Sequence, residues 1–270
     1  MSTVTVLAAT GKTGRRVVRA LAHAGHTVRA ASRSSACRFD WDDDSTWPDA
    51  LAGADAVYLV ADESEQQLER LERFVTLAGD YGVRRLVLLS ARQWSEFPNP
   101  LWDRYLTRET MVRAGSVPWT ILRPVWFLQN FTEEPYLADG LAAGAVTHGF
   151  GEGRHPFIDA EDIAAVAAVA LTEDGHAGHI YELSGPEAVT AAEVVAALGA
   201  ARGRDIAARG PSSEDYAAFS QQFFGEDAAE LVALMDVIRE DKDARLSDGV
   251  ERVLGRPPRS VAQFAATAAM

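Results

Sequence analysis

Cysteine is almost absent from this chain of 270 residues, in which Cys37 stands alone. An internal disulfide is therefore excluded, and a single thiol is typical of a reducing compartment. Long apolar runs are also absent, because none approaches the ~18 residues of a membrane-spanning helix. The first ten residues lack the basic start and the small-residue cleavage site of a signal peptide. We therefore expect a cytoplasmic protein without a membrane partner.

Positive charge is scarce as well. The formal net charge is −13 and the isoelectric point is about 4.9, a balance that repels nucleic acid. Only two of the 26 basic residues are lysines, Lys12 and Lys242, which leaves few candidates for a catalytic lysine. The six histidines show no metal-ligand spacing, so we expect no metal. A small-molecule substrate is the partner we expect, for a chain that is a monomer or a homodimer.

Short apolar segments alternate with segments of helical spacing. Strand-like segments lie at 3–8, 27–32, 55–61, 84–91, 119–124 and 179–185. Helical spacing covers 14–24, 68–78, 102–114 and 159–171. Thr190 and Glu193 have the spacing of a capping box before a further helix. This alternation predicts an α/β fold with a doubly wound parallel Rossmann sheet.

The stretch "LAATGKTGRRV" at 7–17 joins the first strand to the first helix, and its Gly-Lys-Thr resembles the end of an ATP-binding phosphate loop. Such a loop needs a glycine five residues before the Gly-Lys pair, where this chain has Val6. The spacing fits a dinucleotide turn instead. Gly11 would let the backbone approach a pyrophosphate at the helix N-terminus, and Gly14 would let the helix pack close to the strand.

The end of the second strand indicates which dinucleotide is bound. A site that prefers NAD places a carboxylate there for the ribose 2′-hydroxyl. This chain has Ser32-Arg33-Ser34-Ser35 and no acid. Arg33 is either a solvated loop residue or the partner of a 2′-phosphate, and its position favours the phosphate, hence NADP(H).

Beyond Pro124 the alternation loosens, and we expect a second part of the molecule. We assign 1–185 to the NADP-binding Rossmann domain, with 126–150 folding over the substrate pocket. We assign 186–270 to a smaller, mainly helical substrate-binding region. Within it we expect two or three helices over 211–270, and in the first part "WFLQNF" at 126–131 is expected to start a helix.

With these motifs the chain resembles the NmrA-like atypical short-chain dehydrogenases. The resemblance lies in "AATGKTG", "VRAASR", "LLSA", "TILRPVWFLQNF" and "HPFIDAEDIA". The blocks "RFDWDDDSTW", "VYLVA" and "GRPPRSVAQF" are similar to the ergot-alkaloid (festuclavine and agroclavine) dehydrogenase branch. That branch reduces a cyclic iminium with NADPH, so the resemblance implies an NADPH-dependent oxidoreductase with a small hydrophobic substrate.

The resemblance also implies roles for particular residues. The cofactor phosphates would contact Thr10, Gly11, Lys12, Thr13, Gly14 and Arg33. Asp40 and Trp41 would flank the adenine. The nicotinamide side would be lined by Val60, Ala61, Ser90 and Ala91. The segment from Pro124 to Phe127 would close over the nicotinamide, and Asn130 would face the substrate.

The orthodox Tyr-x-x-x-Lys dyad of short-chain dehydrogenases is missing. The best-placed tyrosine is Tyr105, but Glu109 stands four residues later, and it would disfavour tyrosinate. A cyclic iminium needs no proton donor, so C=N reduction is the preferred hypothesis. A ketone remains an alternative, with Tyr105, water or the substrate's own hydroxyl as proton donor. A non-catalytic NADP(H) sensor is the third alternative.

Aromatic residues are candidates for the wall of the substrate pocket. They are Trp94, Trp102, Trp126, Phe127 and the helical stripe Tyr216, Phe219 and Phe223. The stripe fits an ordinary core equally well. Asp62 and Glu63 either attract a cationic substrate or only begin a solvated helix. His148 and His155 are interpreted as loop residues.

Overall fold

The fold is described from a computed structural model, which covers residues 1–61, 67–92, 100–225 and 228–268. Its centre is a seven-stranded, entirely parallel sheet with the order β3-β2-β1-β4-β5-β6-β9. The strands are β1 (Thr3–Val6), β2 (Thr27–Ser32), β3 (Cys37–Arg38), β4 (Ala56–Leu59), β5 (Arg85–Leu89), β6 (Trp119–Pro124) and β9 (His179–Leu183). The prediction of a doubly wound Rossmann sheet is confirmed.

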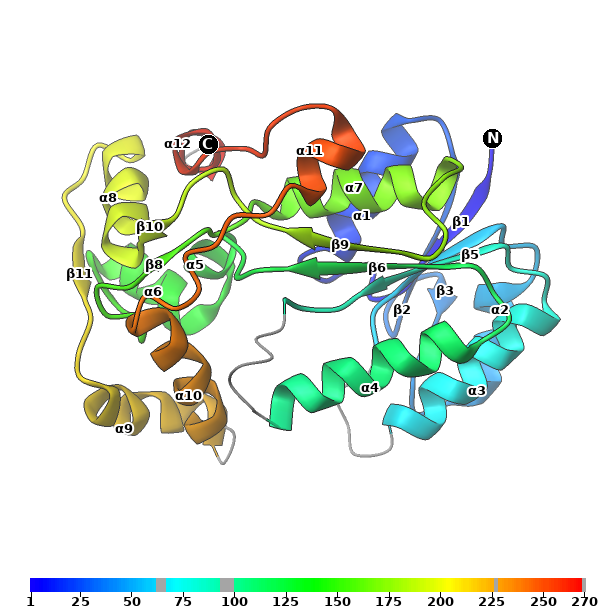
Figure 1. The fold of residues 1–270 in the computed structure, drawn as a ribbon, viewed down its shortest axis with the longest axis horizontal. Coiled ribbons are helices and arrows are strands. Elements are labelled where there is room, and N and C mark those ends of the chain that lie inside the picture. The colour runs from blue at the N-terminus through cyan, green and yellow to red at the C-terminus, as the bar shows by residue number, and fades with distance from the viewer. Residues whose placement is uncertain (62–66, 93–99, 226–227, 269–270) are drawn as a thin grey trace.

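Helices cover both faces of this sheet (Figure 1). On one face lie α1 (Gly14–His23), α7 (Ala160–Thr172) and α11 (Gly249–Leu254). On the other lie α2 (Trp47–Leu51), preceded by the 3₁₀ helix η1 (Asp44–Thr46), with α3 (Gln67–Asp80) and α4 (Pro100–Ala114). Side chains alternate between the faces of each strand, so Val4 and Val6 enter one hydrophobic core and Leu7 enters the other. Burial on both faces explains the continuous apolar runs of the sequence.

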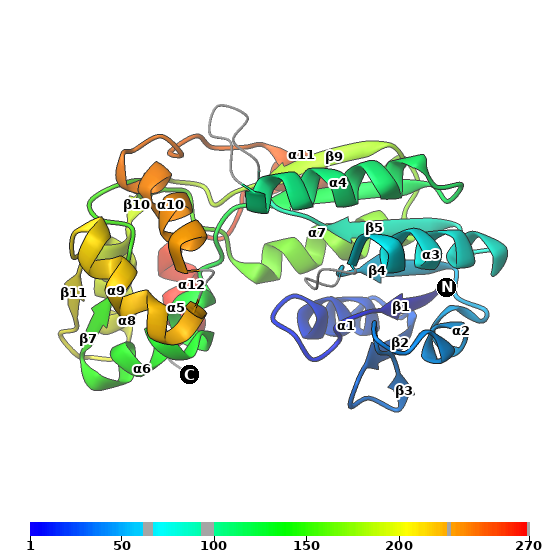
Figure 2. The same cartoon turned by 90° about the horizontal axis from the view of Figure 1, so that it is seen from below.

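A second part packs beside the carboxyl ends of the strands (Figures 1 and 2). Its helices are α5 (Asn130–Glu133), α6 (Pro135–Ala143), α8 (Ala191–Ala201), α9 (Ser213–Phe224), α10 (Ala228–Arg239) and α12 (Val261–Ala268). Its strands pair as β7 (Ala145–Thr147) with β11 (Ala207–Arg209), and β8 (Arg154–His155) with β10 (Val189–Thr190). These elements share a third hydrophobic core, and we call them the C-terminal lobe.

Two sequence predictions about this region are wrong in detail. The described part of 211–270 holds α9, α10, α11 and α12, not two or three helices. The segment 126–129 precedes its helix rather than starting it, because the backbone of Trp126 and Leu128 pairs with Ile158. The domain boundary at residue 185 remains a prediction. None of the helices in the described ranges is both long and apolar enough to cross a bilayer.

Candidate cofactor and substrate site

The glycine turn is built tightly against the sheet. Strand β1 ends at Val6, and Ala8 takes a left-handed conformation with φ 49°. Gly11 N donates to Ala8 O at 2.8 Å. A Cβ on Gly14 would lie 2.1 Å from Ala8 O, so only glycine allows α1 to pack here. Gly11 and Thr10 are exposed, so the outer side of the turn is open to a ligand.

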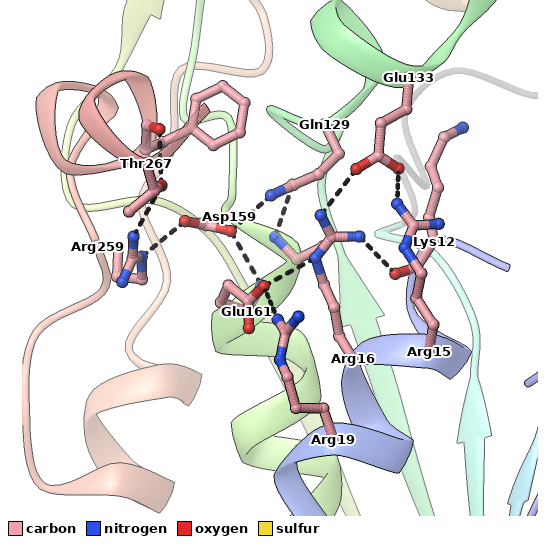
Figure 3. Close-up of polar contacts among 12 residues, drawn as sticks. Lys12, Arg15, Arg16, Arg19, Gln129, Glu133, Asp159, Glu161, Arg259 and Thr267 are labelled. Carbon is pink, nitrogen blue, oxygen red and sulfur yellow. Dashed lines mark hydrogen bonds and ion pairs between the residues drawn. The ribbon is translucent and has the colours of Figure 1, made fainter. Parts of the chain in front are cut away.

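Three cations follow the turn at the N-terminal end of α1. Lys12 ion-pairs with Glu134. Arg15 Nη2 lies 2.5 Å from Glu133 Oε2 (Figure 3). Arg16 Nη2 lies 2.7 Å from Glu133 Oε1. Burial tends to raise the pKa of Glu133, but hydrogen bonds from the two arginines hold it below its usual value. The start of the C-terminal lobe is therefore tied electrostatically to the turn where a pyrophosphate would bind.

Arg16 also fixes the turn and links it to α7. Its Nη1 donates to Lys12 O at 2.8 Å and its Nε donates to Glu161 Oε1 at 3.0 Å (Figure 3). Arg19 pairs with the same carboxylate. No local sequence pattern marks these pairs, because the carboxylates lie more than a hundred residues away along the chain.

The loop after β2 carries the serine hydroxyls and the arginine from which a 2′-phosphate site was predicted. Ser32 is buried, and its Oγ lies 2.6 Å from Ser35 Oγ and accepts from Ser34 N at 3.3 Å. Arg33 is exposed at the tip of this loop. The described loop therefore offers hydroxyls and a cation, and residues 32–36 contain no carboxylate. Arg33 stays a predicted ligand of the cofactor.

Asp40 and Trp41 lie beside the end of β4. Trp41 Nε1 donates to Val60 O at 3.3 Å, and Trp47 Nε1 donates to Asp40 O at 2.9 Å. The Trp41 ring meets Phe74 edge-on, with centroids 5.2 Å apart. The structure thus brings together Asp40, Trp41 and Val60, which the resemblance placed on the cofactor, although it also gives Trp41 a packing role.

The carboxyl end of β5 carries Ser90 in a buried polar chain. Ser90 N donates to Leu122 O at 2.8 Å, which places it beside β6. Ser90 Oγ donates to Glu109 Oε1 at 2.6 Å. Glu109 is only 1% exposed and accepts from Arg123 Nε at 2.9 Å. Ser90 and the half-buried Ala61 and Ala91 follow β4 and β5 and so share one edge of the sheet.

Tyr105 lies on α4, half-buried, with the guanidinium of Arg108 5.0 Å from its ring centroid. Four residues after Tyr105 lies the buried Glu109, which accepts hydrogen bonds from Ser90 and Arg123. The two lysines lie elsewhere, Lys12 on Glu134 and Lys242 on Glu240. Neither stands in the place of the dyad lysine. A proton-donating role for Tyr105 stays a prediction.

The segment after β6 is held along its whole length. Val125 N donates to Leu183 O at 3.0 Å, and Leu128 N donates to Ile158 O at 2.8 Å. Trp126 N donates to His155 Nε2 at 3.2 Å. The segment from Pro124 to Phe127 is therefore a fixed strap at the carboxyl end of the sheet. Asn130, the first residue of α5, follows this strap and is half-buried.

The aromatic candidates for the substrate pocket separate in space. Tyr216 is 1% exposed in the core of the C-terminal lobe, and burial raises its pKa to about 12. Phe219 packs 5.8 Å from it, whereas Phe223 is 46% exposed. The Trp126 ring packs edge-on against Phe150 at 5.4 Å. Trp94, Asp62, Glu63 and the side chain of Trp102 lie outside the described residues.

These features fit a dinucleotide. The turn has an open glycine, a helix N-terminus and a lysine, and the loop after β2 has an arginine with two hydroxyl neighbours. The sequence matches the family described as NAD(P)H-binding over residues 8–174. The chain belongs to the NAD(P)H-binding family. Its predicted nicotinamide dinucleotide cofactor is thereby confirmed.

Curated relatives place the chain more closely within this family. Festuclavine synthase I of Penicillium roqueforti is 31% identical, over 97% of both chains. Festuclavine dehydrogenase of Aspergillus fumigatus is 30% identical, over 97% of this chain and 96% of the relative. The uncharacterized oxidoreductase YesF of Bacillus subtilis is 34% identical, over 97% and 94%. The resemblance to the NmrA-like clavine dehydrogenases is confirmed, and this member of the NAD(P)H-binding family is an oxidoreductase.

Solved structures share the fold. The NADPH-dependent quinone oxidoreductase of Escherichia coli, complexed with NADPH, superposes with a TM-score of 0.77 at 24% identity, covering 98% of this chain and 99% of that chain. Triphenylmethane reductase of Citrobacter, complexed with NADP(H), has a TM-score of 0.77 at 22% identity, covering 99% and 100%. In the described ranges no three metal-ligating side chains gather.

Proposed function

We propose that this chain is an NADPH-dependent reductase of a small hydrophobic metabolite in secondary metabolism, and that it reduces a C=N bond. The observation that carries the proposal is the place of Glu109. It occupies the lysine position of the orthodox dyad, and it is engaged by Ser90 at 2.6 Å and by Arg123 at 2.9 Å. Neither of the two lysines of the sequence stands at the dyad position four residues after Tyr105.

The hydroxyl of Ser90 is likewise occupied by a hydrogen bond. A serine hydroxyl has one proton, and Ser90 gives it to the Glu109 carboxylate. Its oxygen keeps lone pairs that accept, so Ser90 cannot donate to the oxygen of a ketone. An iminium N–H, by contrast, could be accepted there. The pair therefore suits a cationic substrate better than a carbonyl.

The chemistry balances without a proton donor. NADPH supplies a hydride when bound. An iminium carbon that accepts hydride forms a C–H bond, the C=N π pair moves to nitrogen, and the cationic charge is neutralised. The chain's own residues then need only orient the reactants: the strap from Pro124 to Phe127 is predicted to cover the nicotinamide, and the glycine turn is predicted to hold the phosphates. The names of the clavine-type relatives support this assignment.

Two iminium probes and one variant test the proposal. N-Methyl-dihydroisoquinolinium is permanently cationic, whereas dihydroisoquinoline loses its proton at high pH. NADPH oxidation with the first should persist as pH rises, and with the second it should fall along the probe's own pKa. Tyr105→Phe should change either rate little, as should the control Tyr81→Phe at an exposed tyrosine.

Ketone reduction makes the opposite prediction. If α-tetralone were the better substrate and Tyr105 its proton donor, Tyr105→Phe would cost on the order of 10²–10⁴ in rate. That outcome, with NADPH binding intact, would overturn the C=N assignment. NADPH binding without turnover of any imine or ketone would instead favour the sensor alternative.

A further inference from the structure

Arg92 is a buried arginine at the carboxyl end of β5, two residues after Ser90. Its side chain is 1% exposed. Its backbone N donates to Pro124 O at 2.9 Å, so it lies directly beside the strap predicted to cover the nicotinamide. In doubly wound folds, ligands bind in the crevice at this end of the strands. A buried cation at such a position requires partners.

Only one nitrogen of its guanidinium is well satisfied. Nη1 donates to Arg245 O at 2.7 Å and lies 3.3 Å from Asp243 Oδ1. Nε and Nη2 are buried and find no hydrogen-bond partner among the residues that the structure describes. These two nitrogens form one edge of the planar group, and their N–H bonds point the same way. A buried pair of unmet donors is costly unless an acceptor reaches it.

The charges around Arg92 decide which acceptor fits. Asp243 balances Arg92, and Glu182 Oε2 lies 2.8 Å from Arg245 Nη1. His155 Nδ1 lies 2.9 Å from Asp243 Oδ2, while its Nε2 accepts from Trp126 N. Nε2 therefore carries the lone pair, and the ring is neutral with its proton on Nδ1. Burial also lowers the pKa of His155. Arg92 and Arg245 are positive, Asp243 and Glu182 are negative, and His155 is neutral, so the charges of these groups cancel.

We infer that the Nε–Nη2 edge of Arg92 binds an uncharged carbonyl oxygen of the substrate, separate from the bond that is reduced. A carbonyl oxygen has two lone pairs for the two N–H groups and adds no charge to a balanced cluster, whereas a carboxylate would leave it negative. Arg92 is thus a specificity-determining residue. It selects hydrophobic substrates that carry a ketone, lactone, lactam or quinone oxygen. The inference rests on the proposed reductase function for its site, not on C=N reduction.

Binding to the NADP⁺ complex tests this inference without turnover. α-Tetralone and tetralin share one ring skeleton and differ by a carbonyl oxygen, and neither is reduced by the oxidised cofactor. Calorimetric titration of the wild type should show α-tetralone binding about 10- to 150-fold more tightly, as expected for a hydrogen bond to a charged group. Arg92→Met should abolish the difference. The control Arg245→Met removes an exposed neighbouring cation and should preserve it.

A folding defect does not obscure the result. Arg92→Met leaves Asp243 buried without its cation, so Arg92→Met combined with Asp243→Asn is the balanced variant, and thermal unfolding checks both. The affinities of the wild type for α-tetralone and tetralin also test the inference without any variant. Equal affinity for the two probes would mean that the edge holds internal water only, and tighter binding of tetralin carboxylate than of α-tetralone would contradict an uncharged acceptor. Either outcome overturns the inference. If imines are not reduced but α-tetralone is preferred, only the proposed function fails.

Discussion

The guanidinium Nε of Arg259 lies 2.7 Å from Oδ2 of Asp159, although a hundred residues separate them (Figure 3). Asp159 Oδ1 accepts from Glu161 N at 2.9 Å and so caps α7. Gln129 Nε2 donates to the same carboxylate at 2.7 Å. One buried carboxylate therefore joins the start of α7, the residue just before α5 and the tail that leads to α12. The contact therefore links the segments "HPFIDAEDIA" and "GRPPRSVAQF".

Arg259→Met should lower the free energy of unfolding by about 1.5–3 kcal/mol, because Asp159 would keep its charge and lose a charged partner. Denaturant unfolding measures the loss. Arg209→Met, at an exposed arginine on β11, is the matched control. A loss no larger than that of the control would mean that the contact adds no stability.

Arg33→Ala should weaken NADPH binding and spare NADH binding. One charge-assisted contact to the 2′-phosphate is worth ~1.5–3 kcal/mol, which is roughly a 10- to 150-fold loss of affinity. Fluorescence titration with both cofactors measures the ratio. Equal affinity of the wild type for NADH and NADPH would remove the basis of this prediction.

The two glycines of the turn should respond differently. A Cβ on Gly11 would lie 3.2 Å from Ala8 O, a tight contact that a small backbone shift relieves, whereas a Cβ on Gly14 would overlap the same oxygen at 2.1 Å. Gly11→Val should therefore fold and fail to bind NADPH, because its side chain enters the predicted pyrophosphate site. Gly14→Ala should lose stability by about 1–3 kcal/mol or more. Thermal unfolding and NADPH titration of both variants distinguish the roles, and normal cofactor binding by Gly11→Val would place the phosphates elsewhere.

His148 should make the protein sensitive to acid. Burial, with a smaller effect of Arg239, lowers the pKa of His148 from 6.5 to about 4. Between these values the unfolded chain binds a proton that the folded chain does not, so stability falls as pH drops from 7 towards 4. His148 Nδ1 has no hydrogen-bond partner in the described structure, and the ring stacks on Phe150. His148→Phe therefore removes the titration without removing a hydrogen bond at that atom.

Between pH 7 and pH 4.5 the wild type should lose about 2 kcal/mol more stability than His148→Phe. Urea unfolding at both pH values gives the difference. His23→Gln, at an exposed histidine on α1, should behave like the wild type. The assignment fails if His148→Phe and the wild type lose stability in parallel.

The sequence alone determined those features whose interacting residues lie close together along the chain. The spacing of Gly11 and Gly14 predicts a tight turn before a helix, and the structure shows the overlap that any side chain on Gly14 would cause. Thr190 and Glu193 form the capping box that their spacing predicts, since both partners lie within one helical turn. The strand at 119–124 was predicted to the residue, because it is a short segment that ends at a proline and is centred on the buried Ile121 and Leu122.

Tertiary structure decided the interactions between distant segments. The sequence placed Glu109 four residues after Tyr105, but only the packing of α4 against β5 and β6 gave that carboxylate to Ser90 and Arg123. No sequence pattern pointed to Arg92, because its charged partner Asp243 lies 151 residues away along the chain. Short-range patterns record backbone preferences and burial periodicity, whereas the partner of a buried charge depends on which elements the fold brings into contact.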